Sequence, residues 1–201
     1  MDSPLIFTVR LDINPKTAAI SNDWFNNKHL WDLLSAGFLS GARFKSLQGT
    51  PEYMHIYELP NSSILSSPEF SDIIGKDPQE PIMMRNFSNL SSALYKQTIT
   101  SQVLPTDYSV PRPAGNPLRG ITSTYLITIR MDVNPESDED FQQWHENEHI
   151  PLMLKTKGFI SARLCKQVDN QTDYPNNEPQ WMSIWEISSL ESVKDPQVDL
   201  A

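Results

Sequence analysis

Cysteine is almost absent from this 201-residue sequence, which contains only Cys165. One thiol excludes an intramolecular disulfide and favours a reducing compartment, so we expect a cytoplasmic protein. The sequence also lacks any run of 18 apolar residues, and it therefore predicts no membrane-spanning helix. Its first residues contain no basic stretch followed by a long apolar run, so we expect no signal peptide.

Positive charge is also scarce, because 16 lysines and arginines face 25 acidic residues and give a net charge of −9. No cluster of five or more basic residues occurs, which argues against nucleic acid and anionic membranes as partners. The seven glycines form no phosphate-binding loop, so we expect no nucleotide cofactor. An acidic surface is also common in soluble enzymes, so the charge identifies no partner by itself; the expected partner is a small hydrophobic molecule.

The sequence contains an internal repeat of one module. IFTVRLDINP at 6–15 matches LITIRMDVNP at 126–135, and three later blocks match in the same order. In this alignment Arg43 recurs as Arg163. Four matched blocks in one order indicate two copies of one domain. The three later blocks pair residues 23–34 with 143–154, 37–44 with 158–164, and 53–59 with 181–187.

Each copy has the same predicted order of elements. Leu5–Ile13 and Tyr125–Val133 alternate apolar and polar residues, which predicts half-buried strands. A helix follows the Asn-Pro turn, and Gly37 and Gly158 are expected to end the two helices in the left-handed conformation. Two strands come next. The expected helix caps are Ser21 or Asn22 in the first copy and Ser137 or Asp138 in the second.

The first copy continues with a helix predicted over 83–94 and a closing strand over 95–103, which completes a β-α-β-β-α-β order. The predicted fold class is therefore α+β, with tandem ferredoxin-like modules. We expect the first module at 1–103, a proline-rich linker at 104–120 and the second module at 121–201. The second module lacks its last strand, which leaves a sheet edge to be covered, so both a monomer and a homodimer are allowed.

The second helix contains the pattern W-x4-H-x-P, formed by Trp144, His149 and Pro151, and Gly158-Phe159 opens the next strand. With the order of elements, these residues resemble the dimeric α+β barrel superfamily, in its EthD-like and stress-responsive branches. The resemblance implies an intramolecular barrel of two modules. It also implies a range of activities, among them cofactor-free oxygenases, polyketide cyclases, isomerases, lyases, haem peroxidases and proteins without known activity.

The first copy departs from this pattern, because Trp31 replaces the proline and Asn26 and Lys28 replace the acids. Any site in the first module is therefore expected to differ from the second or to be degenerate. His29 is the counterpart of His149 and is retained as a possible substrate-binding residue.

The second helix carries the predicted catalytic residues. His149 lies at the margin of the apolar stripe, where a histidine that titrates near neutrality acts as a general base. Glu148 or Asn147 would orient His149 or the substrate. The alternative is a structural histidine bonded to a backbone carbonyl. Helical spacing places the stripe itself at Phe141, Trp144, His145, Glu148 and Leu152.

Arg163 and four strand aromatics complete the predicted site. Arg163 would hold a carboxylate or an enolate oxygen, and its alternative role is a salt bridge to Glu186. The aromatics occupy one strand face in each copy and would line a pocket with Trp144, although core packing is the alternative. These predicted substrate-binding aromatics are Tyr53, Tyr57, Trp181 and Trp185.

Residues His145, Glu146 and His149 fit the zinc pattern H-E-x-x-H by letter. The other copy has one histidine in its helix, which favours an accidental match, so we expect no metal and no cofactor. The leading functional hypothesis is a cofactor-independent enzyme of secondary or aromatic metabolism. It would remove a proton from a carbonyl-bearing, polyketide-like substrate and give cyclisation, isomerisation or elimination. The alternatives are a non-catalytic ligand-binding barrel, a cofactor-free oxygenase and a zinc hydrolase.

Overall fold

The computed structural model describes residues 4–102, 120–168, 175–196 and 198. The chain divides into two compact units. The first unit comprises Met1–Lys96 with Val168–Glu178, and the second comprises Gln97–Gln167 with Pro179–Ala201. The expected linker at 104–120 lies outside the described residues, apart from Gly120.

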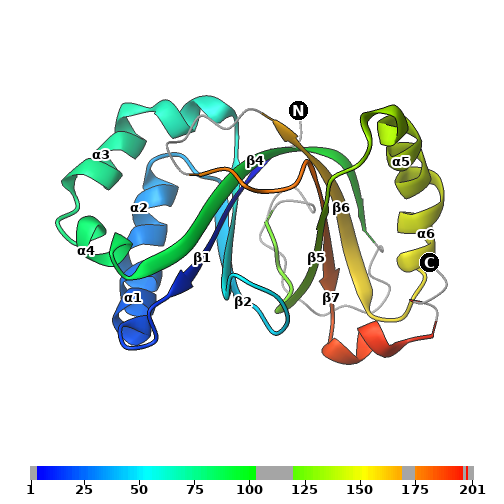
Figure 1. The fold of residues 1–201 in the computed structure, drawn as a ribbon, viewed down its shortest axis with the longest axis horizontal. Helices are drawn as coiled ribbons and strands as arrows, with labels where there is room; N and C mark the ends of the chain where they lie inside the picture. Colours follow the sequence, from blue (N-terminus) through cyan, green and yellow to red (C-terminus); the bar gives the residue numbers. More distant parts are fainter. Residues whose placement is uncertain (1–3, 103–119, 169–174, 197, 199–201) are drawn as a thin grey trace. The chain divides into compact units, whose positions relative to one another are not determined.

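The first unit has an antiparallel sheet in the order β2-β3-β1-β4, with helices on one face (Figure 1). This is the ferredoxin-like arrangement that the sequence predicts. The core lies between the sheet and the helices and contains Phe7, Phe38 and Leu94. The strands are β1 (Leu5–Ile13), β2 (Ser40–Lys45), β3 (Tyr53–Leu59) and β4 (Phe87–Gln102). The helices are α1 (Ala18–Trp24), α2 (Leu30–Ser35), α3 (Pro68–Lys76) and α4 (Glu80–Met84), with a 3-10 turn, η2, at Ser62–Ser66.

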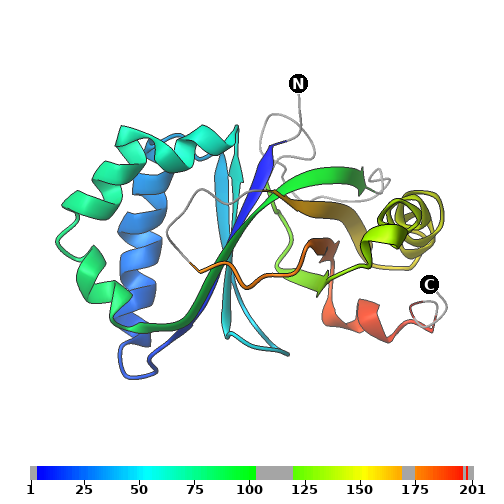
Figure 2. The same cartoon turned by 45° about the horizontal axis from the view of Figure 1, so that its top comes forward.

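The second unit has a sheet in the order β4-β6-β7-β5, of which β4 contributes its end from residue 97 (Figure 2). Thr98 Oγ1 donates to the Leu164 carbonyl at 3.1 Å on neighbouring strands. After β7, residues 188–196 and 198 contain a 3-10 turn, η5 (Leu190–Lys194), and no strand. The remaining elements are β5 (Tyr125–Met131), α5 (Asp138–Trp144), α6 (Ile150–Met153), β6 (Phe159–Val168) and β7 (Trp181–Ile187).

The helix predicted over 83–94 is wrong. Helix α4 ends at Met84, and β4 already begins at Phe87 and pairs with β1. Residues 86–92 are rich in serine and asparagine, whose side chains compete with helical backbone hydrogen bonds. Leu94 lies opposite Phe7 in the register, so strand pairing buries the apolar residues that suggested a helix. No helix in the described part of the chain is both long and apolar enough to cross a membrane.

The helix ends confirm some predictions and correct others. Gly37 and Gly158 have φ values of +105° and +91°, the left-handed conformation expected of them. Ser137 is the N-cap residue of α5, as predicted. The first helix begins earlier than expected, with Thr17 as its N-cap. The reason is the turn at Asn14, whose carbonyl accepts the Thr17 amide at 2.9 Å and leads directly into the helix.

A π-helical turn interrupts the long helix of each unit at equivalent positions. Turn η1 (Phe25–His29) lies between α1 and α2, and η4 (His145–His149) lies between α5 and α6. A π turn adds one residue, so the buried face moves from His145 to Ile150 and Met153.

The apolar stripe predicted for this helix is therefore wrong in part. Trp144 is 40% exposed, Leu152 is 39% exposed and Glu148 is also exposed. Only 3% of His145, another residue of the predicted stripe, is exposed. The prediction failed because it assumed an uninterrupted α-helix, whereas the π turn adds one residue.

Candidate functional site

A cavity of about 50 Å³ lies between the sheet and the helices of the first unit. Most of its lining is apolar and aromatic. Four ionisable side chains face it from four different elements, and two of them come from adjacent strands. The ionisable residues are His29 of η1, Arg43 of β2, His55 of β3 and Glu80 of α4.

His55 of β3 lines this cavity. The residue is 5% exposed, its Nδ1 lies 3.2 Å from the Tyr57 hydroxyl, and its Nε2 is buried without a hydrogen-bond partner. Burial, and then the nearby charges of Arg43 and His29, hold the pKa of His55 well below its ordinary value. The ring is therefore neutral at neutral pH, with Nδ1 beside the Tyr57 hydroxyl and Nε2 buried.

Arg43 lies directly opposite His55 in the β2–β3 register, on the same sheet face. Its guanidinium carbon lies 4.4 Å from the Phe25 ring centre and 5.6 Å from the Tyr53 ring centre. Its Nη2 approaches Asn26 Oδ1 at 3.5 Å, and no carboxylate of the described residues forms a salt bridge with it. Burial lowers the pKa of Arg43. The guanidinium packs against the two aromatic rings.

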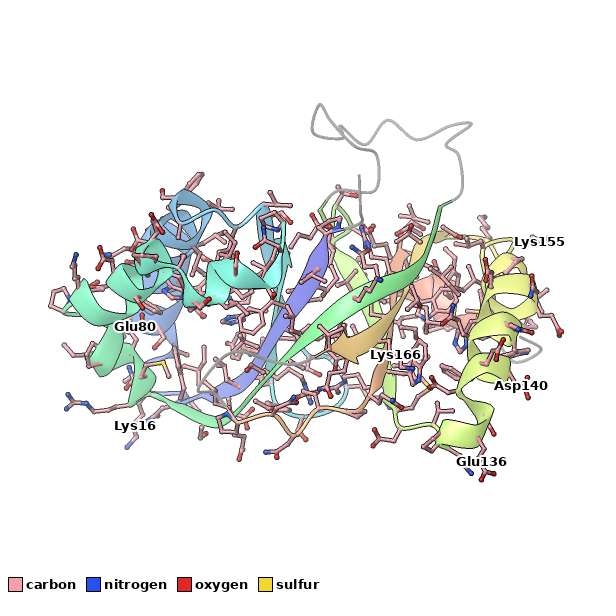
Figure 3. The ribbon with its side chains drawn as sticks, turned by 90° about the horizontal axis from the view of Figure 1, so that it is seen from above. Lys16, Glu80, Glu136, Asp140, Lys155 and Lys166 are labelled. Atoms are coloured by element: carbon pink, nitrogen blue, oxygen red, sulfur yellow. The ribbon has the colours of Figure 1, made fainter. Side chains whose placement is uncertain are left out.

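His29 and Glu80 form the outer part of the site. The His29 ring stacks on Trp24 with 4.5 Å between ring centres, and its Nδ1 lies 3.4 Å from Glu80 Oε2. Glu80 is only 4% exposed and lies where α4 begins, as Figure 3 shows. Trp24 is itself fixed, because its Nε1 donates to Asp77 Oδ2 at 3.1 Å.

In the second unit, His149 packs among aromatic rings. It stacks on Trp144 at 4.4 Å between ring centres and meets the edge of Trp185 at 5.3 Å. The two residues expected to orient it, Asn147 and Glu148, are exposed to solvent. The catalytic role of His149 stays a prediction. Asn147 and Glu148 do not form a buried site around its ring.

His145 is held by the backbone of its own helix. Its Nδ1 donates to the Phe141 carbonyl at 3.0 Å. Burial lowers the pKa of His145, against the effect of this hydrogen bond, and the neighbouring His149 lowers it further. Among the described residues, no group of three or more His, Cys, Asp or Glu side chains is placed to hold a metal ion. The zinc pattern therefore lacks a third ligand in the described part of the chain.

Arg163 lies on the sheet face away from the helices of its unit. It pairs with Glu186 at 3.1 Å, and both side chains are almost fully buried. Burial raises the pKa of Glu186, but Arg163, the Ser161 hydroxyl and two backbone amides together hold it below its ordinary value. The salt-bridge alternative for Arg163 is thus confirmed, and the residue does not meet His149.

The alignment of Arg43 with Arg163 is wrong. Arg43 lies opposite His55, whereas Arg163 lies opposite Ile184. Ser40 lies opposite Glu58, and Ser161 lies opposite Glu186, so these two pairs are equivalent. Counting from them, the equivalent of the Arg43–His55 pair is Leu164 opposite Ser183. The sequence alignment placed a gap at Gly41, and a shift of one residue moves a side chain to the other face.

The predicted aromatic residues divide between the two units. Tyr57 lines the first-unit cavity, and Tyr53 packs against Arg43 at its edge. Trp181 and Trp185 are fully buried in the core of the second unit. Sequence reasoning missed His55 and Glu80. The signal for His55 was present, since it is a lone histidine between two tyrosines on one strand face.

Comparisons with known proteins support the fold. A family profile described as a domain of unknown function, DUF4286, matches residues 124–195, a little over a third of the chain. The sequence matches no curated protein at a significant level.

Solved structures resemble both units together. An anthrone oxidase-like protein superimposes with a TM-score of 0.62 at 11% identity, covering 96% of this chain and 76% of that one. A provisionally assigned monooxygenase of Lactobacillus acidophilus gives 0.59 at 12% identity, covering 99% and 85%. A chlorite dismutase of Candidatus Nitrospira defluvii gives 0.56 at 15% identity, covering 99% and 82%.

These similarities establish the fold and leave the activity open, because each identity is below 16%. The chain has a fold of the dimeric α+β barrel type, built from tandem ferredoxin-like modules, as the sequence predicts. The finer EthD-like resemblance is not confirmed by them.

Proposed function

We propose that the first-unit cavity is the working site of a cofactor-independent enzyme that removes a proton from a small, planar, carbonyl-bearing substrate. One observation carries the proposal. His55 is buried and neutral at neutral pH, it lines an apolar cavity beside Arg43, and its Nε2 has no hydrogen-bond partner among the described residues. A neutral imidazole at the wall of a water-poor cavity is suited to general-base chemistry.

The proposed step is a proton transfer from carbon to His55 Nε2. The C–H electron pair becomes the enolate, and the imidazole becomes a cation. Arg43 lies opposite His55, so its positive charge stabilises the developing enolate oxygen. Return of the proton to another carbon gives isomerisation, and attack of the enolate on a second carbonyl of the substrate gives cyclisation.

The size of the cavity limits the substrate. The cavity of about 50 Å³ is smaller than the roughly 150 Å³ that encloses a benzene ring, so a single-ring molecule enters only if lining side chains move, and a larger polyketide-like substrate fits still less well. It also does not fit a haem, which is much larger. The aromatic lining, which includes Trp24, Phe25 and Phe38, suits a flat apolar body.

Oxygenation is a second candidate. The anthrone oxidase-like protein and the Lactobacillus acidophilus protein described as a monooxygenase share the fold of this chain, which supports a reaction of the enolate with dioxygen. Proton removal by His55 would come first in either reaction. Oxygen consumption by the full-length protein with an enolisable substrate separates this candidate from isomerisation.

The test measures proton removal directly. The full-length protein is incubated in D₂O with phenylacetone, and loss of the α-proton signal is followed by NMR. We expect catalysed exchange, and we expect His55→Gln to slow it by about 10²- to 10⁴-fold, the range for loss of a general base. His149→Ala serves as the matched variant in the second unit and should leave the rate unchanged.

The outcomes distinguish the two units. Full exchange in folded His55→Gln protein would refute the proposal. Loss of exchange in His149→Ala, with His55→Gln active, would indicate that the working site lies in the second unit, where the sequence predicts it.

A further inference from the structure

The first-unit cavity contains a positive charge that no acid of the described residues balances. Arg43 is half-buried, and its nearest groups are the Phe25 and Tyr53 rings and the Asn26 amide oxygen. The one carboxylate that lines the cavity is Glu80, and it lies 3.4 Å from His29 instead. A guanidinium in this position keeps its donors available to a ligand.

The partner strand supplies a second, independent indication of a ligand. His55 lines the same cavity and is 95% buried, and its Nε2 has no hydrogen-bond partner in the part of the chain that the structure describes. An unpartnered buried nitrogen carries an energetic cost that a bound polar group would remove. Cation and imidazole are cross-strand neighbours, so one ligand can contact both.

The second unit shows that the fold itself does not need this pair. Its corresponding strand positions hold Leu164 and Ser183, and the serine hydroxyl accepts the Trp185 indole N–H at 3.0 Å. The second unit fills this space with apolar and internally satisfied groups. Arg43 and His55 are therefore an addition to the module and not a requirement of it.

We infer that the first-unit cavity binds a small aromatic carboxylate, with the carboxylate on Arg43 and the ring among the aromatic side chains. The planar guanidinium fork matches a carboxylate, and His55 Nε2 contacts the ligand from the opposite strand. The rings of Trp24, Phe38 and Phe70 supply the apolar walls. This inference rests on the proposed function for its site and adds the charge of the substrate.

The test compares three probes on the full-length protein by isothermal titration: benzoate, its neutral analogue benzamide, and inorganic phosphate. We expect benzoate to bind at least about tenfold more tightly than benzamide, because only the acid pairs with Arg43. Phosphate should not bind measurably, since it has no apolar body. Equal binding of benzoate and benzamide, or no binding of benzoate, would overturn the inference, and binding of phosphate alone would show a simple anion site instead.

Variants locate the contact. Arg43→Gln should weaken benzoate about tenfold or more, and Arg43→Lys should restore part of the affinity, because lysine keeps the charge but loses the fork. Arg85→Gln is the matched control, since Arg85 is an exposed arginine of the same unit. Arg43→Gln should not lower the melting temperature, whereas a purely structural arginine would. Undiminished benzoate binding in Arg43→Gln contradicts the inference.

Failure of this inference is distinct from failure of the proposed function. Arg43-dependent benzoate binding without proton exchange would leave a carboxylate-binding site that is not an enzyme. Proton exchange by His55 without any preference for benzoate would leave the enzyme and remove the carboxylate.

Discussion

At the scale of single residues, the burial of ionisable groups distinguishes the two units. His55 is kept neutral inside an apolar cavity, whereas Arg163 and Glu186 stay charged because each neutralises the other. The first arrangement suits proton transfer and ligand binding. The second pairs the two charges within the protein.

The lowered pKa of His55 predicts a pH-dependent stability. Above about pH 6.5 the ring is neutral in both the folded and the unfolded chain. As the pH falls below that value, the unfolded chain binds a proton that the folded chain excludes, so stability decreases toward the lower folded pKa. We expect His55→Gln to remove about 1 kcal/mol of the loss measured by urea unfolding between pH 7 and pH 5.5. An unchanged pH dependence in this variant would contradict the burial of a neutral ring.

The buried pair of Arg163 and Glu186 predicts a large single-mutant effect. Glu186→Gln leaves an arginine that is 2% exposed without its carboxylate, so we expect a loss of about 3–5 kcal/mol in urea unfolding. The double variant Arg163→Met, Glu186→Leu should lose less, because no buried charge remains. If folded Arg163→Met protein instead kept its stability and lost proton exchange, the catalytic role predicted from the sequence would be correct.

At the scale of elements, the π turn η4 explains part of the difference between the predicted and observed sites. The alternation of β1 and β5, the glycine caps and the four matched blocks could be read from the sequence, because each depends on local periodicity or backbone conformation. A π turn leaves no such local signal, and it shifts the residues that follow it, so Ile150 is buried and Leu152 is 39% exposed. The Arg43–His55 pair also could not be predicted, because it depends on a register between two strands.

The glycine that ends the second helix offers a test at this scale. Gly158 has a φ of +91°, and a Cβ there would lie 2.0 Å from Ser192 Oγ of η5. Gly49 has a similar φ of +101°, but its nearest heavy atom would lie 3.9 Å away. Both alanine variants are strained, and Gly158→Ala should cost about 1–3 kcal/mol more because Ser192 must also move. Equal losses in urea unfolding would show that η5 does not pack against the helix end.

At the scale of the whole molecule, residues distant in sequence complete the first unit. Val168–Glu178 belongs to this unit, where Ser92 N donates to the Pro175 carbonyl at 2.9 Å. Arg10 Nη1 contacts both carboxylate oxygens of Glu178, at 2.9 and 3.0 Å. Residues 175–178, which follow β6 in the chain, therefore pack against the unit that contains the candidate site.

The Arg10–Glu178 contact predicts that Glu178→Gln lowers the free energy of unfolding of the first unit. Arg10 and Glu178 are mostly buried, so loss of the charge should cost about 2–4 kcal/mol and speed hydrogen exchange at the Ser92 amide. Glu191→Gln is the control, since Glu191 pairs with Lys194 on the surface and should change stability by less than about 1 kcal/mol. Similar effects of the two variants would argue against a structural role for residues 175–178.

The central claim is that the first unit, and not the second, contains the working site. The most direct measurement is the rate of α-proton exchange of phenylacetone in D₂O for folded His55→Gln and His149→Ala proteins. The account predicts a loss of about 10²-fold or more in His55→Gln and the wild-type rate in His149→Ala. The wild-type rate in His55→Gln would contradict it.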